Sequence, residues 1–92
     1  MRFEWDPIKA TTNFVKHRVG FDEASTAFAD DFGLTVFDPK HSDDEDRFIM
    51  IGFSKRGRLL VVWHTDRNDV TRLISARTAN QLEKDVYNAA RS

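Results

Sequence analysis

Two arginines on one predicted strand are the residues best suited to bind a charged group. Arg72 and Arg77 lie within residues 70–77, where apolar and polar residues alternate as in a β-strand. Because side chains alternate across a strand, we expect Arg72 and Arg77 on opposite faces. Arg77 directly precedes the last predicted helix, whose free backbone N–H groups attract anions, so a guanidinium there suits a phosphate. The alternative is that Arg77 pairs with Glu45 or Asp46 and only joins two strands.

Five further residues are candidates for proton transfer or for binding an anion. Glu45 and Arg47 open the third predicted strand and point to one face, although a solvated charge cluster is the simpler interpretation. His64 follows a continuous apolar run, at the exit of a central strand, where a general base has access to water. Lys16 and His17 end the first predicted helix, where the helix dipole alone favours cations.

The sequence lacks the patterns of metal and nucleotide chemistry. With no cysteine and three dispersed histidines, no zinc site is expected, and the acidic residues 43–46 lack the glycine and spacing of a calcium loop. No glycine-rich phosphate loop, nucleophile elbow or dinucleotide motif occurs. His41 lies in the acidic loop and is expected only to be exposed. We therefore expect no metal and no cofactor, which leaves acid–base catalysis with guanidinium stabilisation of a charged centre.

Cleavage of RNA by attack of its own 2′-hydroxyl group requires only acid–base catalysis and guanidinium groups that stabilise charge. A base removes the 2′ proton, the oxygen attacks the adjacent phosphorus, and arginines hold the dianionic transition state. DNA lacks the 2′ nucleophile, so the same residues would not cut it.

The elements that position these residues predict one small domain over residues 1–92. A chain of 92 residues with 40% hydrophobic and 32% charged residues supports a single core. Strands are expected at about residues 3–5, 32–36, 47–54, 59–63 and 70–77, and helices at about 7–18, 21–29 and after 78. The order β-α-α-β-β-β-β-α, with three hairpin-type connections, predicts an α+β fold: a mainly antiparallel sheet with helices packed on it in two layers.

Three polar residues are expected to cap the helices. Asp6, followed by Pro7, caps the first helix, and Asp22 caps the second. Thr78, with Gln81 three residues later, forms a capping box for the last helix.

The net charge of −1 conceals an asymmetry between the two halves of the chain. Residues 1–46 carry a formal charge of −6 and residues 47–92 a charge of +5. A basic half suits a polyanionic partner, although arginines on the exposed face of a sheet are the simpler explanation.

No apolar run approaches the length of a membrane span and no secretory signal precedes the first strand. The lack of cysteine fits a reducing compartment, and we expect the cytoplasm.

An ordered set of residues along the chain resembles the BrnT toxin family. The set runs from Phe3-Glu4-Trp5-Asp6, Lys9 and Asn13, through Lys16-His17, Phe21-x-x-Ala24, Glu45-x-Arg47, Gly52 and Leu60-Val61-Val62, to Arg72-x-Ile74-Ser75-Ala76-Arg77-x-Ala79, Glu83 and Tyr87. The run Ile-Ser-Ala-Arg before a helix is its most specific part. The resemblance implies a RelE-like ribonuclease toxin of a type II toxin–antitoxin system. It also implies a ribbon-helix-helix antitoxin, BrnA, through which the complex binds operator DNA.

The resemblance assigns roles to the charged residues. It places Arg72 and Arg77 on the scissile phosphate of an RNA substrate and makes Glu45 or His64 the proton-transfer group. Lys16, His17 and Arg47 would contribute to RNA binding. Two positions depart from the family pattern: Arg18 stands where glycine is expected, and Thr78 stands where a second basic residue is usual.

Two functions from other classes remain open at this point. A non-catalytic domain of the same fold could use the basic strand face to bind RNA or an acidic protein. A toxin of this fold could instead inhibit a protein target. Strand arginines without a nearby proton acceptor would favour the first of these alternatives.

Overall fold

The computed structural model describes residues 1–92 as one sheet with three α-helices and two short 3₁₀ helices. In chain order the elements are β1 (Arg2–Glu4), α1 (Pro7–His17), α2 (Phe21–Thr26), η1 (Ala27–Ala29), β2 (Leu34–Phe37), η2 (Pro39–His41), β3 (Arg47–Phe53), β4 (Leu59–Arg67), β5 (Val70–Thr78) and α3 (Gln81–Arg91). This order confirms the predicted α+β class. No α-helix is both long and apolar enough to cross a membrane.

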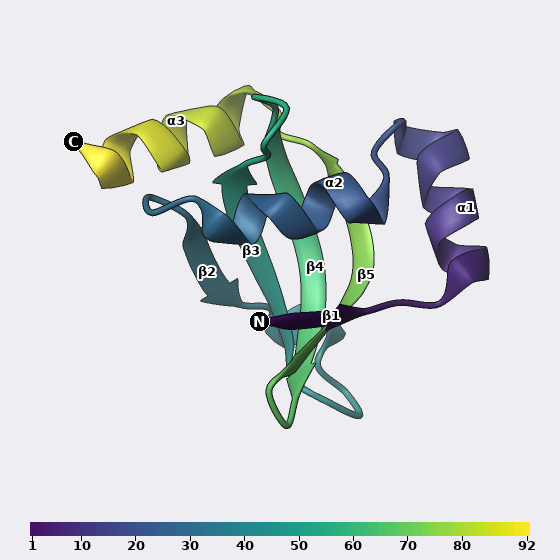
Figure 1. The fold of residues 1–92 in the computed structure, drawn as a ribbon. Helices are drawn as coiled ribbons and strands as arrows, with labels where there is room; N and C mark the ends of the chain where they lie inside the picture. The colour runs from purple at the N-terminus through teal and green to yellow at the C-terminus, as the bar shows by residue number, and fades with distance from the viewer.

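The five strands form a sheet in the order β1-β5-β4-β3-β2 (Figure 1). Successive hairpins make β2 to β5 antiparallel, whereas β1 pairs with β5 in parallel. The tight turn between β4 and β5 consists of Asn68 and Asp69, with φ of 46° and 69°. These left-handed values match the right-handed twist of a hairpin and are tolerated best by Asn, Asp and Gly.

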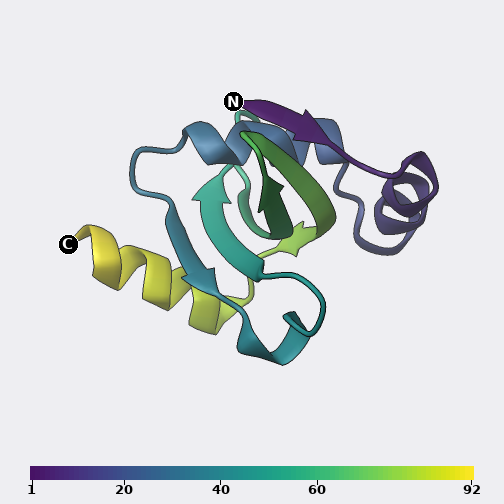
Figure 2. The same cartoon turned by 90° about the horizontal axis from the view of Figure 1, so that it is seen from below.

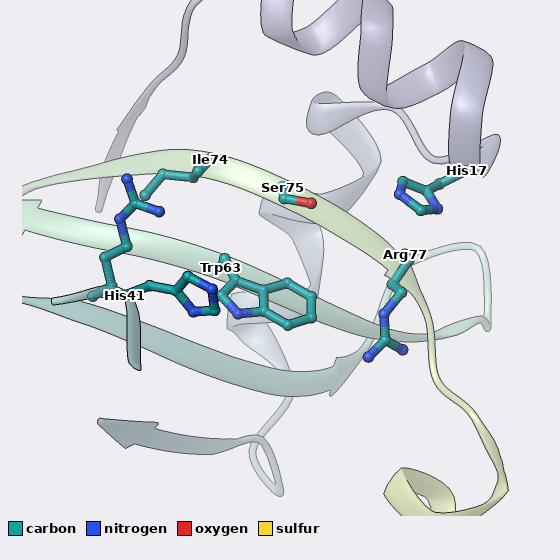
Figure 3. Close-up of a pocket in the computed structure, with 7 residues that line it drawn as sticks. His17, His41, Trp63, Ile74, Ser75 and Arg77 are labelled. Atoms are coloured by element: carbon teal, nitrogen blue, oxygen red, sulfur yellow. The ribbon is translucent and has the colours of Figure 1, made fainter. Parts of the chain in front are cut away.

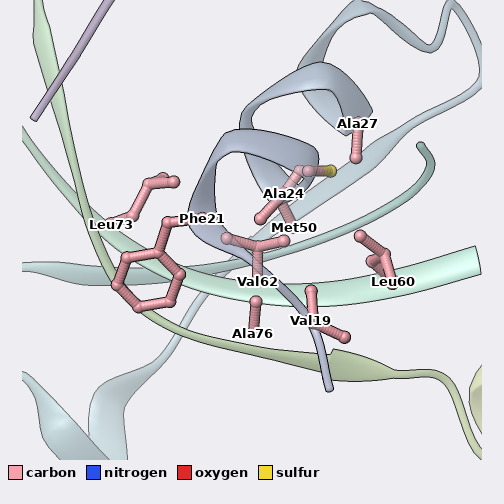
Figure 4. Close-up of a cluster of buried hydrophobic side chains, with 9 residues drawn as sticks. All are labelled: Val19, Phe21, Ala24, Ala27, Met50, Leu60, Val62, Leu73 and Ala76. Atoms are coloured by element: carbon pink, nitrogen blue, oxygen red, sulfur yellow. The ribbon is translucent and has the colours of Figure 1, made fainter. Parts of the chain in front are cut away.

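The helices cover opposite faces of the sheet, as Figure 2 shows for α2 and α3. Phe21 and Ala24 of α2 pack on Leu60 and Val62 of β4 in the main core (Figure 4). On the other face, Tyr87 of α3 packs on Val61. Because neighbouring strand residues point to opposite faces, these contacts place α2 and α3 on the two sides. The second face is covered by α3 at one end and is open beyond it, and we call it the open face.

The cap of α1 is predicted correctly and that of α2 is not. Asp6 accepts a hydrogen bond of 2.8 Å from the Ile8 N–H, directly before Pro7. In contrast, α2 begins after Gly20, and no side chain caps it, so Asp22 lies inside the first turn. An acidic residue there is still favoured by the helix dipole, which explains the misleading signal.

The capping box of α3 lies two residues later than predicted. Thr78 pairs with Leu60 in the ladder between β4 and β5 and is therefore still strand. Asn80 caps the helix, accepting from the Glu83 N–H at 2.9 Å, while the Glu83 carboxylate accepts from the Asn80 N–H at 2.8 Å. The strand therefore continues one residue beyond Arg77 before the helix begins.

Candidate functional site

A pocket of about 280 Å³ lies on the open face of the sheet (Figure 3). Its wall is built from α1, η2 and three strands, so residues far apart in sequence meet there. The lining residues are His17, His41, Arg47, Trp63, Ile74, Ser75 and Arg77. No carboxylate is among them, and the guanidinium groups of Arg47 and Arg77 are the kind of group that binds an anion.

A β-bulge places both strand arginines on the open face. Trp63 pairs with Ser75 and His64 pairs with Leu73, so Ile74 is an extra residue without a partner on β4. The bulge shifts the alternation by one position. The prediction that Arg72 and Arg77 lie on opposite faces is therefore wrong. After the bulge, each side chain of β5 points to the face opposite to the one that regular alternation predicts.

Arg77 is held in place by the helix that follows it. Its guanidinium donates two hydrogen bonds to the Glu83 carboxylate, of 2.7 and 2.8 Å, and one of 3.2 Å to the Thr78 carbonyl. It also lies 5.2 Å from the centre of the Trp63 ring, a cation–π contact. The bonds from Arg77 hold the pKa of Glu83 below its ordinary value, so this carboxylate stays ionised. The alternative that Arg77 pairs with Glu45 or Asp46 and joins two strands is wrong, because its ion pair is with Glu83 and joins β5 to α3.

Asn13 fixes the position of α1 beside the pocket. Its buried amide donates to the carbonyls of Ala76 at 2.8 Å and Val19 at 3.0 Å, and accepts from the Ala76 N–H at 3.1 Å. β1 pairs only with residues 70–72 of β5, so the side chain of Asn13 completes the hydrogen bonds of β5 where no strand does. The same helix ends at His17, which consequently reaches the pocket wall.

Lys16 lines a second hollow that adjoins the pocket. This hollow shares His17, Ile74 and Ser75 with the first and extends along α1. Arg18, at the expected glycine position, adopts the left-handed conformation with φ of 59° and ends the helix. The departure at Arg18 therefore leaves the end of the helix unchanged, because Arg18 takes the conformation that glycine would take.

His41 belongs to the pocket, contrary to the expectation that it is merely exposed. It ends η2 and donates a hydrogen bond of 2.8 Å from Nδ1 to Oδ2 of Asp38. Hydrogen bonds, first that from His41, hold the pKa of Asp38 below its ordinary value. The spacing Asp-x-x-His beside a proline and before a strand is the sequence feature that marks this position.

His64 lies on the other face of the sheet, away from the pocket. Its side chain is 4% exposed, with the rings of Phe28 and Phe48 at 5.0 and 5.7 Å. Nδ1 donates to Asp66 at 3.0 Å, and Nε2 has no partner. Burial lowers the pKa of His64 and outweighs the opposing effect of Asp66. The prediction of a water-accessible position is wrong because β4 continues to Arg67, four residues beyond the predicted end.

Glu45 and Arg72 lie near the pocket but do not line it. Glu45 accepts two hydrogen bonds from Arg67, of 2.6 and 3.0 Å. Arg72 shares the open face with Trp63 and lies 3.5 Å from Glu4 on β1. Arg47, at the start of β3, is the second arginine of the pocket. The structure thus brings together Arg77, Arg47 and His17 from the predicted set, and adds His41, Trp63 and Ser75.

Comparison with known proteins identifies a family and a solved structure that this chain resembles. The model of a family described as "Ribonuclease toxin, BrnT, of type II toxin-antitoxin system" matches residues 5–83, a range that contains every residue of the pocket. The crystal structure of the Brucella abortus ribonuclease toxin, BrnT, matches with a TM-score of 0.64 and 24% identity, over 88% of this chain and 99% of that one. At this identity the match shows a shared fold. Among curated proteins no match is found.

Proposed function

Because this chain belongs to the BrnT family of ribonuclease toxins of type II toxin–antitoxin systems, we propose that the pocket on the open face is its ribonuclease site. RNA is the substrate class that goes with this family, and an antitoxin is its protein partner. The proposal depends on one observation: Arg47, Arg77, His17 and His41 line the same pocket as the Trp63 indole.

The two arginines suit the scissile phosphate. Arg77 presents a planar guanidinium whose orientation is already set by Glu83, so little side-chain entropy is lost when a phosphate binds. Arg47 approaches from β3 on the other side of Trp63, since β4 lies between β3 and β5. Charge that develops on the phosphate in the transition state meets donors that are in place beforehand.

Trp63 suits a base of single-stranded RNA. Aromatic side chains stack on unpaired bases, which contributes about 1–3 kcal/mol per base. Arg77 contacts the indole and lines the same pocket, so a base on Trp63 would bring its own phosphate close to Arg77. Lys16, in the adjoining hollow, and Arg72, on the same face of β5, would extend the path of the backbone.

We expect cleavage to proceed without a metal ion. Arg47 and Arg77 in the pocket carry positive charges that can neutralise a phosphate directly, and 2′-hydroxyl attack requires only proton transfer and charge stabilisation. The products would be a 2′,3′-cyclic phosphate and a 5′-hydroxyl end.

A BrnA-like ribbon-helix-helix antitoxin is the partner we propose for the open face. The row Val36, Ile49, Trp63 and Ser75 crosses the sheet in register, and Val36 is half exposed at the edge strand. A protein that covers this row would present apolar groups to Val36 and acidic groups to the arginines. DNA would then be bound only through the antitoxin. A short ribbon-helix-helix gene beside that of the toxin, whose product blocks RNA cleavage, would support the assignment.

The decisive experiment incubates the purified protein with single-stranded RNA in excess EDTA and identifies the product ends. Substrates with a single 2′-deoxy residue at the cleavage site serve as matched controls. We expect cyclic phosphate ends and no cleavage at the 2′-deoxy position. Loss of cleavage in EDTA would contradict metal independence, and RNA binding without any cleavage would favour the non-catalytic alternative.

A further inference from the structure

The turn between β2 and β3 is built around Asp38. Its backbone N–H donates to the Arg47 carbonyl at 2.8 Å, and one of its side-chain oxygens accepts from the Lys40 N–H at 3.2 Å. The Ser42 hydroxyl donates to the Asp38 carbonyl at 2.5 Å and accepts from the Arg47 N–H at 2.9 Å. The turn is thereby tied to the first residue of β3, so its side chains have a defined position relative to Arg47.

The carboxylate of Asp38 fixes the state of the His41 ring. The side chain of Asp38 is 7% exposed, and its Oδ2 accepts a hydrogen bond of 2.8 Å from Nδ1 of His41. With Nδ1 protonated, Nε2 carries the free lone pair and can accept a proton. His41 itself is 55% exposed, so Nε2 can meet a substrate.

Of the three histidines, His41 combines a carboxylate bonded to Nδ1 with an accessible Nε2 in the pocket. His64 also bonds a carboxylate, but its Nε2 is buried on the opposite face. His17 reaches the pocket, but no carboxylate bonds its ring. A carboxylate-bound imidazole with an open Nε2 in the pocket therefore occurs once in this protein.

Resting on the proposed ribonuclease activity, we propose that His41 Nε2 accepts the proton of the RNA 2′-hydroxyl and that Asp38 is the positioning residue which holds the ring for it. Figure 3 shows His41 and Arg77 at opposite ends of the Trp63 indole, so a nucleotide on Trp63 can contact both. His41 is then a catalytic residue, whereas Glu45 and His64, which the family resemblance suggests for proton transfer, are not needed as bases.

The reaction balances with this assignment. The proton moves from the 2′-hydroxyl to Nε2 as a bond forms between the 2′-oxygen and phosphorus. The bond from phosphorus to the 5′-oxygen breaks, and that oxygen takes a proton from water in the open pocket. His41 then returns its extra proton to solvent. Arg47 and Arg77 hold the charge on the phosphate throughout.

The test compares single-turnover cleavage in EDTA by the wild type and three variants of the full chain. We expect His41→Ala to lose about 10²–10⁴-fold in rate, the range for general acid–base catalysis. Asp38→Asn, which keeps the shape but weakens the hold on the ring, should lose at least about tenfold. Lys40→Ala, in the same turn, should stay within about twofold and controls for disturbance of the turn.

Two further readouts separate a catalytic from a structural role. Affinity for an uncleavable RNA with a 2′-deoxy residue should change little in His41→Ala, and added imidazole should restore part of its cleavage rate. A His41→Ala protein that cuts at the wild-type rate, or whose lost activity imidazole fails to restore, would overturn the inference. In either case an active wild type leaves the proposed function intact, whereas a wild type that is inert in EDTA contradicts the proposed function itself.

Discussion

Arg77 and Glu83 are joined by two parallel hydrogen bonds across the junction between β5 and α3. The same carboxylate accepts the Asn80 N–H in the capping box. The start of the last helix and the guanidinium of the pocket therefore depend on one side chain.

Glu83→Gln should lower stability and reduce its dependence on acid pH. Because Arg77 lowers the pKa of Glu83 in the folded state, the wild type gains stability from this pair above the ordinary glutamate pKa of about 4.3. That stability is lost as the pH falls through the lower, folded pKa. We expect a loss of about 1–2 kcal/mol at pH 7, shrinking toward pH 3, measured by urea unfolding. An equal loss at both pH values would contradict this account of the pair.

Asn13→Ala should destabilise the protein by about 2–4 kcal/mol, because it leaves the buried N–H and C=O of Ala76 without partners. The measurement is the free energy of unfolding in urea. Thr12→Ala, an exposed position on the same helix, is the matched control and should change stability by less than about 0.5 kcal/mol. Similar effects of the two substitutions would show that Asn13 does not anchor α1.

Arg18→Gly should stabilise the protein by about 0.5–1 kcal/mol. Arg18 has φ of 59°, a conformation that glycine adopts without the cost of a side chain. Its carbonyl, which accepts from Arg58, is unchanged by the substitution. Lys16→Gly, two residues earlier within the helix, should do the opposite and cost about 0.5–1 kcal/mol. Thermal melts of both variants test the contrast, and a destabilised Arg18→Gly would contradict it.

His64→Phe should flatten the dependence of stability on pH between neutral and mildly acid conditions. Burial lowers the pKa of His64, so below the ordinary histidine value of about 6.5 the unfolded chain binds a proton that the folded protein resists. The wild type therefore loses stability as the pH falls below about 6.5 toward the folded pKa. Phenylalanine fits among Phe28 and Phe48 and cannot titrate. Urea unfolding at pH 7.5 and pH 5 should show a smaller difference for the variant, and an unchanged difference would contradict this.

Periodicity and turn residues were sufficient to predict the element order, because each element carries its own local pattern. The Asp6-Pro7 start of α1 and the apolar run of β4 are examples. The pairing of β1 with β5 was not predictable in the same way, since it joins segments almost seventy residues apart. Local patterns contain no information about which distant strand becomes the neighbour.

The pocket was only partly predictable, for two physical reasons. Alternation along β5 could not reveal that Ile74 is a bulge, and the bulge decides which face Ser75 and Arg77 occupy. A linear pattern does not show hydrogen bonds between side chains either, so the sequence predicts only exposure for His41 and not its bond to Asp38. Arg77 and His17 are predictable as site residues because two local features indicate them: their charge and their position at the end of a strand or helix.

The most direct test of the central claim is the cleavage rate of Arg77→Ala on single-stranded RNA in EDTA, with Arg91→Ala as the matched control. Arg91 lies at the far end of α3, over Phe32, and lines no part of the pocket. Both variants are assayed at a temperature where melting curves show them folded. We expect a loss of about 10²–10³-fold for Arg77→Ala and a wild-type rate for Arg91→Ala. Equal cleavage by Arg77→Ala and the wild type would contradict the placement of the ribonuclease site in this pocket.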